Sequence, residues 1–203
     1  MTCDLIEQLH DYWFGSIEQG FPVHDRVDLW FRARPQHDWE VSRLFGPAVE
    51  AALEGQLESL ATSPQGRLSL ILLLDQLPRH LFRHTAQAYC GDEAALRHCR
   101  EGMAAGQDRH LAPCQRLFFY APLEHCEDMA VQRQAVANFA EFMAEMPEPV
   151  AQRLAYFAHW IQVHHDVIQR FGRFPWRNRA LGRPSTCDEI EYLENNPPYL
   201  GQW

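Results

Sequence analysis

Three short segments of this chain carry polar residues where the surrounding apolar spacing predicts a core. The first, Asp75-Gln76-Leu77-Pro78-Arg79-His80, directly follows the apolar run Leu70 to Leu74. Asp75 and Arg79 are four residues apart, so on a helix they share one face and can form an ion pair. Pro78 has no amide hydrogen to donate and is expected to kink the helix. Two interpretations stay open: a solvated surface pair, or a partly buried pair that holds a ligand.

The second segment, Pro122-Leu123-Glu124-His125-Cys126-Glu127-Asp128, is expected at the start of a helix. Carboxylates in a first turn are favoured by the helix dipole, which would explain the acids without any function. The dipole does not explain His125, because an imidazole beside three carboxylates is suited to carry protons near neutrality. His125, with Glu127 to orient it, is therefore a candidate for acid–base chemistry.

A long helix is predicted from Pro149 to Phe171, because residues three or four apart form two apolar rows there. Each row contains one histidine, His164 in one and His165 in the other. At least one of them must point inward, where its ring nitrogens need hydrogen-bond partners. His165 is taken as the candidate site residue, and a core histidine with satisfied partners is the alternative.

Five of the 18 basic residues lie within fourteen positions at the end of this helix and after it: Arg170, Arg173, Arg177, Arg179 and Arg183. The aromatic stretch Phe174 to Trp176 runs between them, so one interpretation is a rigid surface that pairs with an anion. The other is that these arginines neutralise acids on other helices, including Asp75, Glu124 and Glu127. The candidate ligand-binding residues of all three segments are Asp75, Gln76, Arg79, His125, Glu127, His165, Arg173, Arg177 and Asn178.

Helical spacing recurs along the whole chain, whereas the alternation typical of strands is nearly absent. We therefore expect an all-α fold of eight or nine helices, joined by short loops into a helical array or superhelix. With 203 residues the chain is expected to form a single domain over residues 1–203.

Proline and capping residues predict where several helices begin. Pro47 is expected to open a helix that reaches Leu60, because proline at the first helical position forfeits no helical hydrogen bond. Asp92 is expected to cap the helix that ends near Ala105. Thr186 precedes the last helix, where Glu189 completes a capping box.

Composition limits the class of partner. A formal charge of −9 argues against general binding to nucleic acid or to an anionic membrane. The run Leu70 to Leu74 is far shorter than the roughly 20 apolar residues of a membrane helix. Every basic residue is arginine, whose planar guanidinium can bind a carboxylate or phosphate through two hydrogen bonds.

The six cysteines form no CxxC pair and no basic leader precedes them, so we expect free thiols in the cytoplasm.

Taken together, the three segments resemble a bacterial family known as domain of unknown function 924. The residues that carry the resemblance are Asp75-Gln76-Leu77-Pro78-Arg79, Pro122-Leu123-Glu124-His125-Cys126-Glu127, His165, Phe171-Gly172-Arg173-Phe174-Pro175-Trp176-Arg177-Asn178 and Leu181-Gly182-Arg183. The resemblance spans nearly the whole chain and implies an all-helical fold similar to tetratricopeptide superhelices. It implies no activity. The chain departs from the family pattern at Trp176, where histidine is expected, and at His80, where asparagine is expected.

Three classes of function stay open. The first and favoured one is a binding module, whose concave face holds an anionic small molecule or peptide end through the arginines and His165. The second is an enzyme, with His125 or His165 as general acid or base, oriented by Glu127 or Asp75. The third is an interaction scaffold in which the polar residues only stabilise the fold.

Two weak patterns would suit metal-assisted hydrolysis: the adjacent pair His165-Asp166, and the i,i+4 spacing of His80 and His84. Neither selects a cofactor or a reaction, and no oligomeric state is indicated. We expect the three segments to converge, with a carboxylate of Asp75 or Glu127 within reach of one of the candidate arginines.

Overall fold

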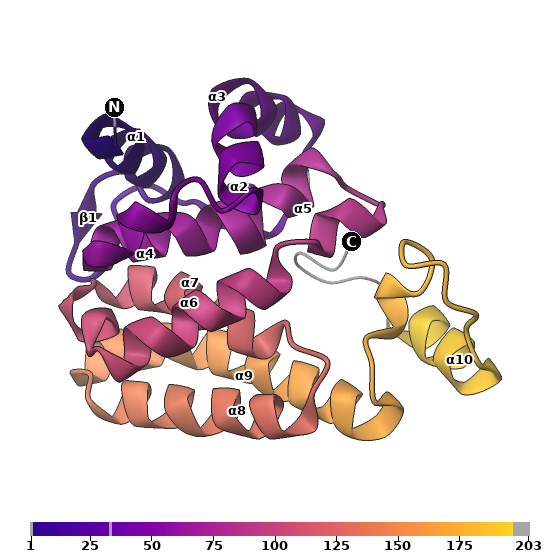
Figure 1. The fold of residues 1–203 in the computed structure, drawn as a ribbon. Coiled ribbons are helices and arrows are strands. Elements are labelled where there is room, and N and C mark those ends of the chain that lie inside the picture. The colour runs from indigo at the N-terminus through magenta and orange to yellow at the C-terminus, as the bar shows by residue number, and fades with distance from the viewer. Residues whose placement is uncertain (1, 33, 197–203) are drawn as a thin grey trace.

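The computed structural model describes residues 2–32 and 34–196, which are built almost entirely of helices (Figure 1). The α-helices are α1 (Thr2–Trp13), α2 (Val27–Phe31), α3 (Pro35–Leu53), α4 (Pro64–Ile71), α5 (Leu77–Leu81), α6 (Asp92–Ala104), α7 (Pro113–Glu124), α8 (Met129–Ala144), α9 (Glu148–Phe171) and α10 (Cys187–Asn195). Shorter elements are the 3-10 helices η1 (Glu58–Thr62), η3 (Ala86–Tyr89), η4 (Gln107–His110) and η5 (Pro175–Arg177), the π-helical turn η2 (Leu72–Gln76), and the hairpin β1 (Ile17–Glu18) and β2 (Phe21–Pro22). Since α4, η2 and α5 form one continuous rod, the described part of the chain has nine separate helices. The all-α prediction is confirmed, whereas the tetratricopeptide-like arrangement stays a prediction.

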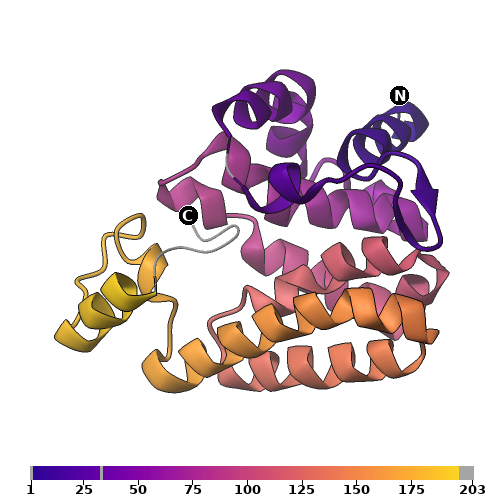
Figure 2. The ribbon, with the colours of Figure 1, turned by 180° about the vertical axis from the view of Figure 1, so that it is seen from behind.

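The helices form successive layers (Figures 1 and 2). Helices α1 to α5 lie on one side of the molecule, α8 and α9 pack together on the other, and α6 and α7 lie between them. Helix α10 and the segment before it stand apart at one end. Within the described ranges, no helix combines the length and the apolar composition that a membrane span requires.

The rod from α4 to α5 crosses the centre of the core and changes its hydrogen bonding at η2. Pro78 has no amide hydrogen for the carbonyl of Leu74, and the preceding turn is widened, so that the amide of Leu77 donates to Leu72 five residues back. A π-helical turn therefore precedes Pro78, and the kink expected there stays a prediction. The turn is buried, and it brings Asp75 into the core with no exposed surface.

Gly91 packs against this turn and fixes where α6 begins. A Cβ atom at Gly91 would collide with the carbonyl of Leu74, so only glycine permits this approach. Gly91 is also the N-cap of α6, and Asp92 is its first helical residue. The prediction that Asp92 caps this helix is wrong, because its side chain makes no cap hydrogen bond and turns toward the arginines described below.

One helix boundary predicted from proline is also wrong. Pro47 opens no helix, since it lies inside α3, and Leu60 belongs to the separate η1. Pro47 and Arg43 are both exposed, so the carbonyl that Pro47 leaves without a helical donor can be solvated. The second segment begins in the last turn of α7, where Pro122 lies, and ends at Asp128, the N-cap of α8, so the helix start expected in this segment is present.

Candidate functional site

A cavity of about 100 Å³ lies between the N-terminal helices, α7, α9 and the segment that follows α9. A water molecule needs roughly 10–15 Å³ on this scale, so the cavity has room for about seven waters or a small organic molecule. Its polar lining includes Gln76, Arg79, His80, Tyr89, Glu124, His125, His164 and Arg177. Its apolar lining includes Trp30, Phe31, Leu117, Phe118, Phe139, Phe157, Ile161, Phe174 and Trp176. The cavity thus combines an aromatic body with a few charged and hydrogen-bonding groups.

Asp75 lies behind the cavity wall, enclosed by partners. The amide of Gln76 donates to its Oδ2 at 2.5 Å, and Nη1 of Arg79 lies 3.3 Å from its Oδ1. Arg79 also donates to the backbone carbonyl of Asp75. Burial alone would raise the pKa of Asp75, but the charges and hydrogen bonds of Arg79, His125 and Gln76 hold that pKa well below its ordinary value. Asp75 is therefore a buried, ionised carboxylate.

His125 is oriented by this carboxylate. It is the C-cap of α7, and its Nδ1 lies 2.7 Å from Oδ1 of Asp75, fifty residues away in the sequence. Because an ionised carboxylate only accepts hydrogen bonds, Nδ1 carries the proton and donates. His125 also lines the cavity, so Nε2 is the nitrogen that stays available to a molecule bound there.

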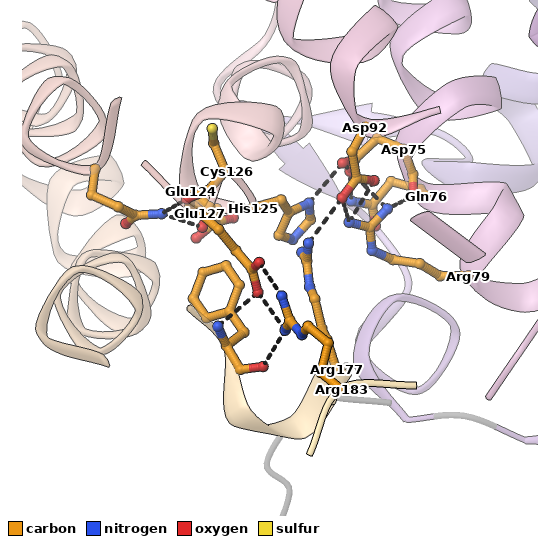
Figure 3. A network of polar contacts seen from close by, with 12 residues as sticks. Asp75, Gln76, Arg79, Asp92, Glu124, His125, Cys126, Glu127, Arg177 and Arg183 are labelled. Atoms are coloured by element: carbon orange, nitrogen blue, oxygen red, sulfur yellow. Dashed lines mark hydrogen bonds and ion pairs between the residues drawn. The ribbon is translucent and has the colours of Figure 1, made fainter. Parts of the chain in front are cut away.

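Asp92 joins two of the cavity's arginines. Its Oδ1 lies 3.0 Å from Nη2 of Arg79, and its Oδ2 accepts from Nη1 of Arg177 at 3.1 Å. Figure 3 shows Asp75, Arg79 and Asp92 close together, with His125 and Arg177 pointing toward them. The first and third sequence segments therefore meet through a carboxylate that belongs to neither. The predicted convergence of the three segments is confirmed.

Arg177 reaches the cavity from η5 and is only 7 % exposed. Its guanidinium lies over the rings of Tyr89 and Phe174, with 4.6 and 4.8 Å to the ring centroids. Burial, with the like charge of Arg79, lowers the pKa of Arg177 from its ordinary value despite the opposing effect of Asp92. Its Nε is buried and has no hydrogen-bond partner among the described residues. A buried charged group is thus left with an unused donor in the cavity wall.

His164 is the inward-facing histidine of α9. Its ring lies 6.2 Å from that of His125 and 5.3 Å from that of Phe174, measured between centroids. Its Nδ1 is 3.4 Å from Oε2 of Glu124, but the orientation makes no hydrogen bond. Burial lowers the pKa of His164, and Glu124 only partly offsets that effect. The imidazole is therefore favoured in its neutral form.

His165 does not reach the cavity, so the placement predicted for it is wrong. It is absent from the cavity lining, and its Nδ1 lies 2.9 Å from Oδ1 of the exposed Asp166. The apolar rows had left His164 and His165 both open, and the helix is rotated so that His164 faces inward. His80 and His84 share no helix face, since α5 ends at Leu81. In residues 2–32 and 34–196, no cluster of three or more His, Cys, Asp or Glu side chains has a metal-binding arrangement.

Three other candidate residues hold the segment after α9 in place. Arg173 pairs with Glu189 at 2.6 Å, and the amide of Asn178 donates to the same carboxylate at 3.3 Å. Glu127 accepts from the backbone amide of Phe174 at 2.7 Å and from Arg183 at 2.6 Å. Burial would raise the pKa of Glu127, but these hydrogen bonds lower it. Arg173, Asn178 and Glu127 are absent from the cavity lining and act on its wall indirectly.

Trp176 belongs to that wall. Its ring stacks on Phe174 at 4.8 Å between centroids and lies 5.8 Å from the ring of His164. The aromatic side chain that replaces the expected histidine therefore extends the apolar lining rather than the polar one.

Sequence reasoning missed three lining or supporting residues. Asp92 was assigned to a helix cap, and Glu124 to a favourable helix dipole, because both lie near predicted helix starts. Glu124 is at the C-terminal end of α7, so the dipole does not account for it. Tyr89 gave no signal, since one tyrosine in a loop has no periodicity. A glycine directly before an amphipathic helix, Gly91, was the one feature of the sequence that could indicate a close approach of another backbone segment.

Comparison with known proteins assigns the chain to a family. The sequence model of a family described as bacterial protein of unknown function, DUF924, matches residues 9–197. The chain belongs to DUF924. It is also similar to the solved structure of a protein of unknown function, ATU0120 from Agrobacterium tumefaciens, with 32% sequence identity and a TM-score of 0.80. That similarity covers 97% of this chain and 100% of the Agrobacterium chain. None of the curated proteins matches the chain. The DUF924 assignment agrees with the all-helical fold and names no activity.

Proposed function

We propose that the chain is a binding module whose cavity holds a small organic anion with an apolar body. The observation that carries the proposal is Nε of Arg177, a buried donor on a charged group that has no partner in the described part of the chain. Leaving a buried hydrogen-bonding group unsatisfied costs about 1–3 kcal/mol, and more when the group is charged. A carboxylate oxygen against Nε would remove that cost and match the planar fork of the guanidinium.

The apolar lining supports the second part of the proposal. Phe31, Phe157 and Ile161 offer apolar surface to the body of a ligand, while Arg177 and His164 offer polar contacts. Small-molecule sites commonly have this composition, with mostly apolar walls and a few polar groups that fix orientation. A bare inorganic anion would leave the aromatic surface unused, so an aryl or short alkyl carboxylate is the better match.

The charges around the cavity add a condition. Arg79 and Arg177 are balanced by Asp75 and Asp92, and Glu124 adds one negative charge. An entering anion therefore needs a compensating proton, and His164 is the group that can take it up. We expect anion affinity to rise as pH falls, by up to about tenfold per pH unit when one proton is bound with each anion.

Isothermal titration calorimetry with benzoate tests the proposal, with benzyl alcohol as a ligand of similar shape but no charge. We expect benzoate to bind, benzyl alcohol to bind at least tenfold more weakly, and Arg177→Gln to weaken benzoate binding by about tenfold or more, which is 1.4 kcal/mol. The matched control is Arg179→Gln, two positions away on the same segment and exposed, which should bind benzoate like the parent.

The outcomes also separate the binding module from an interaction scaffold. Equal affinity for benzoate and benzyl alcohol, or no response to either from pH 5 to 8, would contradict the proposal. In that case the polar network serves only to stabilise the fold, and replacing Arg177 should lower thermal stability without any ligand effect.

A further inference from the structure

We propose that His125 is a general base acting on the molecule held in this cavity, and that this molecule is a small 2-oxo acid. The inference rests on the proposed anion binding and adds a reaction to it: exchange of the proton on C3, next to the carbonyl group. Asp75 is the positioning residue, because it fixes the tautomer and the ring orientation of His125 from behind the cavity wall.

The first argument is the arrangement of His125 itself. Its Nδ1 is engaged by the fully buried Asp75 at 2.7 Å, so Nε2 is the nitrogen that remains for the cavity. An imidazole whose Nδ1 is hydrogen-bonded to a carboxylate is oriented for proton transfer at Nε2. Asp75 is itself held by Gln76 and Arg79, so the pair cannot rotate freely.

The second argument is what the cavity lacks and what it offers. Among the lining residues described, none is serine, threonine or cysteine, and the hydroxyl groups there are the phenols of Tyr89, Tyr120 and Tyr156. The groups present are proton carriers and cations. Proton abstraction next to a carbonyl needs only these, because a base removes the proton and positive charge stabilises the enolate oxygen.

The third argument selects the 2-oxo acid. Two buried nitrogens of the lining, Nε of Arg177 and Nδ1 of His164, have no hydrogen-bond partner in residues 2–32 and 34–196. A molecule with oxygens on two adjacent carbons, one carboxylate and one carbonyl, offers an acceptor to each of these nitrogens, although Nδ1 of His164 also lies 3.4 Å from Oε2 of Glu124. The cavity of about 100 Å³ suits a molecule the size of 2-oxobutanoate.

The step balances without a cofactor. The lone pair on Nε2 of His125 forms a bond to the C3 proton while the C3–H bond breaks. Its electrons form a C2–C3 double bond, and the carbonyl π electrons move to the oxygen, which Arg177 or a proton on His164 stabilises. Reversal returns a proton to C3. In D2O the imidazolium exchanges its proton with solvent first, so C3–H becomes C3–D and HDO is released.

Proton NMR of 2-oxobutanoate in D2O measures this exchange directly as loss of the C3 signal. We expect the protein to accelerate the loss at least a hundredfold over buffer, and His125→Gln to abolish the acceleration while calorimetry still detects binding. His159→Gln, an exposed histidine of α9, is the matched control and should exchange like the parent. In Asp75→Asn the imidazole loses the charge that stabilises its protonated form, so the pH–rate profile should shift to lower pH.

Each outcome decides the question. If 2-oxobutanoate binds but exchanges no faster than with His125→Gln, the cavity is a binding site only, and the catalytic inference is wrong while the proposed function stands. If benzoate binds and 2-oxobutanoate does not, the substrate class is wrong. If neither binds, both proposals fail. Should Asp75→Asn not fold, the comparison of the parent with His125→Gln still tests the general base.

Discussion

Asp92 is the position at which the electrostatics of the cavity can be tested most directly. Its carboxylate lies between two buried guanidinium groups, 3.0 Å from Nη2 of Arg79 and 3.1 Å from Nη1 of Arg177. Replacing Asp92 by Asn keeps the size of the side chain and an acceptor oxygen, but it removes the charge. Arg177 then has no carboxylate in contact with it among the described residues, and Arg79 keeps only Asp75.

The expected cost follows from these distances and from burial. At an effective dielectric constant of about 20, a unit charge pair 3 Å apart attracts by roughly 5 kcal/mol before the cost of desolvation is subtracted. Breaking a buried pair by removing one partner typically costs about 3–5 kcal/mol. The side chain of Asp92 is 22% exposed, against 6% for Arg79 and 8% for Arg177, so solvent screens part of the loss. We expect a loss of about 3 kcal/mol in the free energy of unfolding.

Urea denaturation and thermal melting measure this loss, with Glu93→Gln as the matched control. Glu93 shares the first turn of α6 with Asp92, so both variants lose the same helix-dipole interaction, but Glu93 is exposed. A loss of 3 kcal/mol corresponds to a fall of roughly 6–12 °C in melting temperature for a chain of this size. If Asp92→Asn is no less stable than Glu93→Gln, the two guanidinium groups do not depend on this carboxylate, and the charge balance described here is wrong.

Three further outcomes are expected. Glu127→Gln should release the segment 172–196, which limited proteolysis would then cut faster while circular dichroism of the remaining helices is retained. The free energy of unfolding should fall as pH drops below about 6.5, because burial lowers the pKa of His164 and unfolding takes up a proton; urea titrations of His164→Gln should show a smaller fall. Gly91→Ala should lose about 2 kcal/mol or more on denaturation, since its Cβ would collide with the carbonyl of Leu74.

The features that the sequence predicts well depend on residues close together in the chain. Asp75 and Arg79 pair at the i,i+4 spacing that was used to predict them. Thr186 accepts from the amide of Glu189 and the Glu189 side chain accepts from Thr186, which is the predicted capping box. The five cysteines whose side chains are described are free, as the absence of paired spacing indicated. The first two of these depend on spacing within a single turn of helix, which the sequence shows directly.

The features that the sequence does not predict depend on which surfaces meet. Pro47 and Pro122 have the same chemistry as a helix-opening proline, yet both lie inside helices, Pro47 at an exposed position and Pro122 at a buried one. His164 and His165 lie in adjacent apolar rows of one helix, and only the packing of α9 against α7 and α8 decides which row is buried. A rotation of about 100° per residue separates the two outcomes, which periodicity alone cannot distinguish.

Arg173 and Arg177 show why the sequence can indicate the segment of the proposed anion site but cannot distinguish its arginines. Both arginines were equal candidates, and each finds a carboxylate. The partner of Arg173 is Glu189, sixteen residues away, which the capping box of α10 already holds against the same segment. The partner of Arg177 is Asp92, eighty-five residues away, and Arg79 shares it. A guanidinium that is the only arginine paired with its carboxylate, as Arg173 is with Glu189, stabilises the fold. A guanidinium that shares its carboxylate with a second arginine and has an unused donor, as Arg177 does, can bind an additional anion. That distinction depends on distant chain segments, so counting arginines cannot reveal it.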